Sequence, residues 1–191
     1  MLPRACPAHV TLRVREGLPS LRRKSLVKEI RRSFAAACDR GASRLVHFSI
    51  QRDHLHLLLE AEDERALGRA MKSISARVAR TVNRIFKRTG GVLLGRYHVR
   101  ALRTPREVRN ALAYILLNAR KHWTQRFGCA PPVRIDEASS GAWFNGWTRS
   151  VHPLSSREPP PIASPRTWLL RVGWLRHGAI DPSEVPGANS Q

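Results

Sequence analysis

The stretch RDHLHLLLE, Arg52 to Glu60, decides how the rest of the chain is interpreted. Side chains alternate across a β-strand, so His54 and His56 share one face of this stretch and its leucines share the other. The leucine face requires a hydrophobic core. The histidine face requires polar surroundings, and its two imidazoles are a candidate pair of metal ligands.

Three further segments alternate between apolar and polar residues and are expected to be strands. They are residues 9–15, 44–51 and 92–103. The second of them is expected to form a hairpin with the histidine strand through a tight turn. The residues expected to face the core are Val10, Leu12, Val14, Val46, Phe48, Ile50, Tyr97, Val99 and Ala101.

Three helices are expected around these strands. Apolar residues recur at helical spacing over residues 19–41 and 63–87. The third helix begins with Thr104 as a cap, has Pro105 as its first residue, and runs to about residue 122. This order predicts an α+β fold, the ferredoxin-like βαββαβ arrangement of an antiparallel sheet with two helices on one face. The third helix has no place in that motif and could close over the other face.

That other face is polar and basic. It is expected to collect Thr11, Arg13, His47, Ser49, His54, His56, Arg96, His98 and Arg100. The whole chain carries 34 Lys and Arg against 14 Asp and Glu, a formal net charge of +20. Such a charge favours an anionic partner, and nucleic acid is the leading one.

Other classes of protein are less compatible with this composition. No apolar run approaches the about 20 residues that cross a bilayer, so no membrane role is expected. The N-terminus has no apolar stretch typical of a signal peptide, and the three cysteines are too scattered for a disulfide framework or a zinc site. A cytoplasmic location is expected.

The third helix carries a candidate nucleophile. Tyr114 and Asn118 belong to a polar stripe beside the apolar stripe of this helix. A tyrosine aimed at a phosphodiester that a metal ion polarises can displace an alkoxide and keep the phosphate covalently. The amide oxygen of Asn118 would complete a ligand set with the two histidines. Tyr97 is the competing nucleophile, but its strand parity sends it into the core. Asp53 is expected in the turn, where it could also orient a histidine ring.

These residues bring out a resemblance. On DHLHLLLE and GRYHVRALRTPREVRNALAYILLN, and on their order and separation, residues 9–122 resemble the single-tyrosine HUH transposases, within the group of REP-associated tyrosine transposases. The resemblance implies that His54, His56 and Asn118 hold Mg²⁺ or Mn²⁺ and that Tyr114 is the nucleophile. It implies an HUH endonuclease fold that nicks single-stranded DNA beside a hairpin, leaves a 5′-phosphotyrosine and a free 3′-hydroxyl, and then rejoins strands. One departure is NAR after YILL, where many relatives have Asn-Pro.

A non-catalytic DNA- or RNA-binding module on the same sheet is the alternative, and only the enzyme predicts a covalent adduct. In either case DNA contacts are expected from Arg13, Arg96, His98, Arg100 and Lys121. Related enzymes act as dimers or monomers, so a homodimer stays open.

The predicted division places the HUH domain at residues 1–122 and a Pro- and Trp-rich extension at residues 123–191. Its segments GAWFNGW and TWLLRVGWLRHG contain four of the five tryptophans, separated by a proline-rich linker. They are expected to dock on the domain or on a second subunit. The alternative is that Trp143, Trp147 or Trp168 stacks on unpaired bases.

Overall fold

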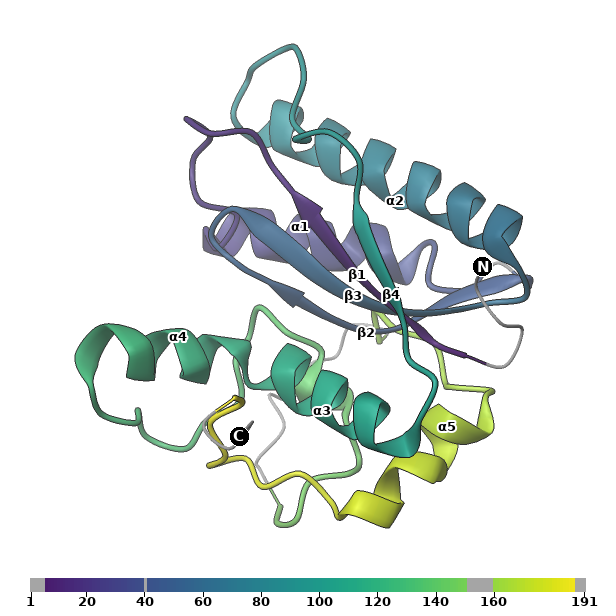
Figure 1. Cartoon of the computed structure of the whole chain (residues 1–191). Helices are drawn as coiled ribbons and strands as arrows, with labels where there is room; N and C mark the ends of the chain where they lie inside the picture. Colours follow the sequence, from purple (N-terminus) through teal and green to yellow (C-terminus); the bar gives the residue numbers. More distant parts are fainter. Residues whose placement is uncertain (1–5, 40, 151–159, 188–191) are drawn as a thin grey trace.

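A computed structural model describes residues 6–39, 41–150 and 160–187 of the chain (Figure 1). Its centre is one antiparallel sheet of β1 (Ala8–Arg13), β2 (Ser43–Ile50), β3 (His54–Ala61) and β4 (His98–Ala101). The spatial order is β2-β3-β1-β4, with β1 between the hairpin and the last strand. This is the split βαββαβ arrangement, so the predicted fold class is confirmed.

The leucine face of the sheet is covered by α1 (Lys24–Ala35) and α2 (Glu64–Ile85). Leu55, Leu57 and Leu59 are at most 1% exposed and belong to a core built with both helices. Asp63 begins α2, because its carboxylate accepts the backbone N–H of Ala66. Figure 1 shows these two helices on one side of the sheet, and α3 with the C-terminal segments on the other.

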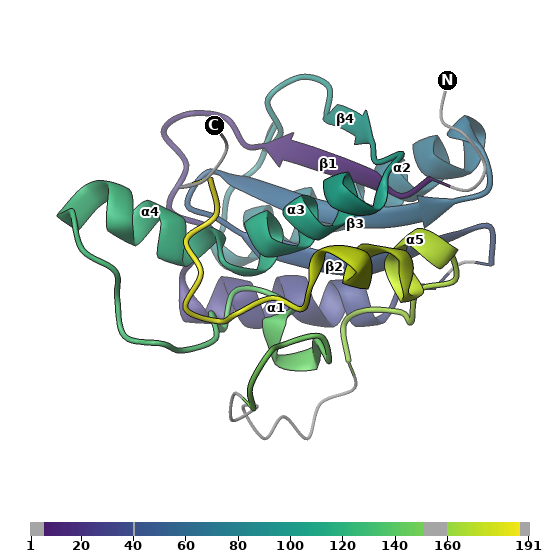
Figure 2. The same cartoon turned by 60° about the horizontal axis from the view of Figure 1, so that its bottom comes forward.

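The histidine face is covered by α3 (Pro105–Leu116), as the sequence suggested. Thr104 and Glu107 form a capping box at its start, which satisfies two backbone N–H groups that the helix leaves free. Figure 2 shows α3 lying across the sheet with α5 (Trp168–Arg171) beside it. A second hydrophobic cluster joins α3 to Val46 and Leu58 of the sheet.

The position of Val46 corrects the expectation that it faces the first core. The pairing of β2 with β3 shifts by one residue between Leu45 and His47, so a β-bulge interrupts the alternation there. Leu45 therefore packs in the first core, whereas Val46 packs against α3 and His47 is buried on the same face.

The fourth strand is shorter than predicted and covers only His98–Ala101. Gly95 has a positive φ of 64°, which interrupts the extended backbone that residues 92–103 were expected to share. Val99 is 42% exposed on this edge strand, so its expected place in the core is wrong. Tyr97 does pack against the first core, as predicted.

The third helix is broken in two, where one helix to about residue 122 was expected. Leu117 has φ −111° and ψ 15°, after which α4 (Asn118–Phe127) begins. Residues 115–118 are all buried, and four consecutive residues cannot occupy one side of a straight helix that turns about 100° per residue. The break allows all four to be buried at once. The first helix is also shorter than expected, since α1 begins at Lys24 and ends at Ala35.

The described part of the extension docks on the domain and continues its second core. Phe144, Leu169, Leu170, Trp174 and Ile180 are buried in the cluster with α3. Buried Glu60 of β3 accepts the backbone N–H groups of residues 166 and 167 at 2.8 Å each, and the hydroxyl of the latter at 2.7 Å. The predicted division at residue 122 falls inside α4, and most of the proline-rich linker lies outside the described residues.

Buried His47 should make the free energy of unfolding depend on pH. Its Nδ1 lies 3.0 Å from the hydroxyl of Ser140, and burial lowers its pKa to about 3 from a usual value of 6.5. Between about pH 6.5 and 3 the unfolded chain binds a proton at this residue that the folded chain does not. Stability should therefore be complete above about pH 6.5 and fall on acidification, by up to about 1.4 kcal/mol per pH unit from this group.

Urea unfolding followed by tryptophan fluorescence at several pH values checks this expectation. His47→Gln should be less stable than the parent near neutral pH but should lose less stability on acidification. His177→Gln, at an exposed histidine of the extension, is the matched control and should keep the parental dependence. An unchanged slope in His47→Gln would contradict the assignment.

Candidate active site

The two histidines of β3 point their Nε2 atoms at one another, 3.0 Å apart. The Nδ1 of His54 lies 2.8 Å from the Oδ1 of Asp53, and since a carboxylate accepts, this nitrogen carries the proton. In the neutral form of this ring, the Nε2 of His54 presents its lone pair toward His56. Asp53 thus orients a histidine ring from the turn, in the way that second partners of metal-binding imidazoles do.

The neighbouring strand β1 holds His56 from its other side. The Nδ1 of His56 lies 3.2 Å from the Nε2 of His9 and 3.2 Å from the hydroxyl of Thr11. The sheet register places Thr11 directly opposite His56, so strand pairing itself creates these contacts. His9 was missed among the predicted site residues, although it shares strand parity with Thr11 and Arg13 and could have been found by extending that alternation.

Burial favours the uncharged forms of His56 and His9. It lowers the pKa of His56 to about 3, and repulsion from His54, His9, His122 and Arg13 in their charged forms lowers it further. The pKa of His9 falls to about 4, first through burial and then through Arg100 and His98. Both imidazoles are neutral at pH 7, and the neutral imidazole is the form that binds a metal ion.

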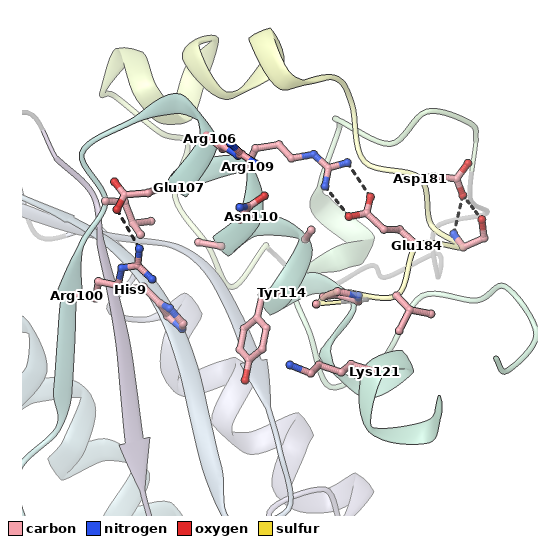
Figure 3. A pocket seen from close by; sticks show the side chains of 17 residues that line it. His9, Arg100, Arg106, Glu107, Arg109, Asn110, Tyr114, Lys121, Asp181 and Glu184 are labelled. Atoms are coloured by element: carbon pink, nitrogen blue, oxygen red, sulfur yellow. Dashed lines mark hydrogen bonds and ion pairs between the residues drawn. The ribbon is translucent and has the colours of Figure 1, made fainter. Parts of the chain in front are cut away.

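Tyr114 of α3 lies next to this cluster. Its ring centroid is 5.0 Å from that of His56 and 6.0 Å from that of His9. The ammonium of Lys121, from α4, lies 4.8 Å from the centre of the tyrosine ring. Figure 3 shows Tyr114, His9 and Lys121 pointing toward a common region. The predicted nucleophile and the predicted metal-binding pair therefore meet, although they are far apart in the sequence.

The tyrosine lines a cavity of about 1050 Å³ (Figure 3). Four basic side chains line it, those of Arg100, Arg106, Arg109 and Lys121, together with the carboxylates of Glu107, Asp181 and Glu184. Residues 181–187 of the extension form another wall, held by the two-pronged ion pair of Arg109 with Glu184 at 2.5 and 2.7 Å. A space this large can admit an extended ligand, and Lys121 provides a positive charge beside the tyrosine.

Asn118, the third predicted ligand, makes no side-chain hydrogen bond to the two histidines. Its side chain is fully buried at the first residue of α4, and neither its amide nitrogen nor its amide oxygen has a partner in the described chain. A buried polar group left unpaired costs about 1–3 kcal/mol. A buried amide without a hydrogen-bond partner is a candidate group for binding a metal ion.

The spacing of the two histidine nitrogens fits an octahedral divalent ion. Two ligands at about 2.1 Å in adjacent octahedral positions are about 3.0 Å apart, which matches the two Nε2 atoms. No three side chains of His, Cys, Asp or Glu are grouped to hold an ion within the described residues, so a third protein ligand would be of another type. The amide oxygen of Asn118 is of that type.

The predicted DNA contacts fall into two groups. Arg100 and Lys121 line the tyrosine cavity, and Arg100 also pairs with Glu107 at 3.0 Å. Arg13, Arg96 and His98 are exposed but do not line the cavity. His122 of α4 was missed as a site residue, although helical spacing from Tyr114 and Asn118 could have found it, and its ring lies 6.5 Å from that of His54.

A ferredoxin-like sheet with paired histidines beside a helix-borne tyrosine is the arrangement of an HUH-type nuclease. The sequence profile of the IS200-like transposases matches residues 4–115, and the chain belongs to that family. Transposase function is assigned on that ground. None of the curated proteins compared with the chain matches it in sequence.

Among solved structures, the fold resembles a REP-associated tyrosine transposase bound to a REP hairpin. The TM-score is 0.51 at 15% identity, over 64% of this chain and 71% of that one. A candidate transposase from Deinococcus radiodurans gives 0.43 at 16% identity, over 51% and 78%. A bacterial tRNA(His) guanylyltransferase-like protein gives 0.47 at 12%, over 65% and 61%. No helix in the described ranges is long and apolar enough to span a membrane.

Replacing Asn118 tests whether its unpaired amide is a metal ligand, and the measurement is of stability alone. Asn118→Leu, of similar size, should raise the free energy of unfolding without metal by about 1–3 kcal/mol, because no polar group then stays unpaired. Mn²⁺ should stabilise the parent and stabilise the variant less, since a ligand that binds only the folded state adds to its stability. Asn110→Leu, on an exposed residue of α3, is the control and should change little. A loss of stability in metal-free Asn118→Leu would contradict the assignment.

Proposed function

We propose that this protein is a metal-dependent tyrosine transposase that nicks and rejoins single-stranded, hairpin-forming DNA. The observation that carries the proposal is the contact of the Tyr114 ring with His56, whose Nε2 faces that of His54. Nucleophile and metal-binding pair are thus within reach of one phosphate. The REP hairpin bound by the structural relative indicates the kind of DNA.

His54, His56 and Asn118 would hold Mg²⁺ or Mn²⁺, which supplies a Lewis acid to the scissile phosphate. The Tyr114 oxygen attacks phosphorus, one P–O bond forms, and the bond to the 3′-oxygen breaks. The tyrosine gives its proton to solvent, and the leaving 3′-oxygen takes up a proton from solvent, so the step balances. Attack by a free 3′-hydroxyl on the phosphotyrosine reverses these changes and joins strands.

This exchange conserves one phosphodiester bond, so it requires no nucleotide energy. Lys121 and Arg100 line the space beside the tyrosine and can neutralise the phosphate charge as it is held there. The basic charge alone would equally suit a non-catalytic binding module. The arrangement of the tyrosine against the histidine pair favours the enzyme, and a covalent adduct separates the two.

Tyr114→Phe tests the nucleophile. Incubation with labelled hairpin DNA and Mg²⁺ or Mn²⁺, followed by a denaturing gel, should show label travelling with the parent protein but not with the variant. Binding of the same DNA should be unchanged within about twofold, because only a hydroxyl is removed. Tyr97→Phe is the matched control and should form the adduct, since that ring packs in the first core. Adduct formation by Tyr114→Phe would move the nucleophile elsewhere.

Single alanine variants of His54 and His56 test the metal pair. Each should lower cleavage by more than about 100-fold, since even the outer partners of metal ligands contribute about 10- to 100-fold. DNA affinity in EDTA should remain close to that of the parent. His177→Ala, at an exposed histidine outside the site, should cleave normally. Normal cleavage by both site variants would remove the metal role.

A further inference from the structure

A second cavity adjoins the histidine pair from the side of α4. It has a volume of about 580 Å³ and is lined by α4, the loop that follows it, and the turn before β3. His54 lines this cavity, whereas His9 and Tyr114, which contact His56, line the first. The histidine pair therefore lies where the two cavities approach each other.

Two large aromatic side chains are exposed in this second cavity. Trp123 is 42% exposed and Phe127 is 52% exposed, although both belong to residue types that usually lose most of their contact with water in folded proteins. They stand one helical turn apart on α4, with ring centroids 4.5 Å apart. Arg126 places its guanidinium 5.2 Å from the centre of the phenylalanine ring. The pair forms an apolar surface edged by positive charge.

The charge of the cavity is strongly positive. Five arginines and two aspartates line it, and both aspartates are engaged, Asp53 with His54 and Asp136 with Arg22 at 2.7 and 2.8 Å. The other arginines on the solvent side are Arg52, Arg126 and Arg134. These three are exposed and have no acidic partner in the part of the chain that the structure describes. They are available to an anionic ligand.

The cavity is preformed by contacts that do not involve these three arginines. Arg120 of α4 donates to the backbone carbonyl of Pro131 at 2.7 Å and to that of Ser183 at 2.8 Å, which holds the loop against the helix and the extension. Gly128 ends α4 with a φ of 71°, a left-handed conformation that turns the chain into this loop. Binding here would require little ordering of the backbone.

We propose that Trp123 and Phe127 form a binding site for an unpaired nucleobase of the single strand whose phosphate is cleaved. The proposal rests on the proposed function and deepens it by naming where the strand runs beyond the histidines. A base stacks on Trp123, and Arg52, Arg126 and Arg134 contact the phosphates on either side of it. Stacking on an aromatic surface beside arginines is how proteins hold single strands without strong sequence preference. The extension tryptophans considered from the sequence are not needed for this site.

Trp123→Ala tests the site through DNA binding alone. With the full chain in EDTA and at fixed salt, the probe is a fluorescently labelled oligothymidylate of about 12 nucleotides, near the span of a typical single-strand site. Trp123→Ala should weaken its binding about tenfold, and Trp123→Phe should restore most of the affinity, because a π-face is what the base requires. Binding of a blunt duplex of the same length should change less than about twofold.

Trp168→Ala is the matched control, because this tryptophan is 49% exposed and has the guanidinium of Arg176 4.8 Å from its ring centre, yet it lines neither cavity. It should bind the oligothymidylate as the parent does. Equal losses in Trp123→Ala and Trp168→Ala, or no loss in Trp123→Ala, would overturn the proposal. So would a loss of self-association in Trp123→Ala, measured by sedimentation, with single-strand affinity unchanged, because the occupant would then be a second copy of the chain.

The outcome is separable from that of the proposed function. Binding in EDTA requires neither metal nor the Tyr114 hydroxyl, so a failed adduct assay leaves the binding result standing. Conversely, a normal phosphotyrosine adduct together with unweakened single-strand binding in Trp123→Ala would leave the enzyme intact and remove only this site.

Discussion

Burial of three leucines on one side of β3 is the constraint on which the rest of the structure depends. Leu55, Leu57 and Leu59 pack under α1 and α2, and because side chains alternate, His54 and His56 must then face the opposite side. Pairing with β1 adds Thr11 and His9 to the same surface. A slip of one residue in the register would send the imidazoles into the apolar core. Hydrophobic burial therefore positions the polar site.

The second face shows how a polar surface becomes a site. α3 and the extension cover it with apolar side chains, and burial keeps His56 and His9 neutral. The break at Leu117 then distributes the polar residues of this stretch over two helices. Tyr114 comes from α3, whereas Asn118 and Lys121 come from α4, and the ammonium of Lys121 lies 4.8 Å from the centre of the tyrosine ring.

Much of this could be predicted from alternation and helical spacing. The order of elements, the two faces of β3, the capping box at Thr104 and the presence of Tyr114 near the histidines all follow from local patterns. The bulge before His47 and the break at Leu117 could not be predicted in this way, because both arise from packing between distant segments. His122, which follows that break, has its ring 6.5 Å from that of His54. The partners of Glu60 lie more than a hundred residues away.

The attachment of the extension to Glu60 has a consequence for the chain as a whole. The segment that matches the family profile ends at residue 115, yet the cluster around α3 is completed by Leu169, Trp174 and Ile180. A polypeptide that stops before these residues would expose an apolar surface on α3 and leave the carboxylate of Glu60 without its three donors. Tyr114 of α3 and the extension thus pack against one hydrophobic cluster. During synthesis, this cluster can be completed only after Ile180 has left the ribosome.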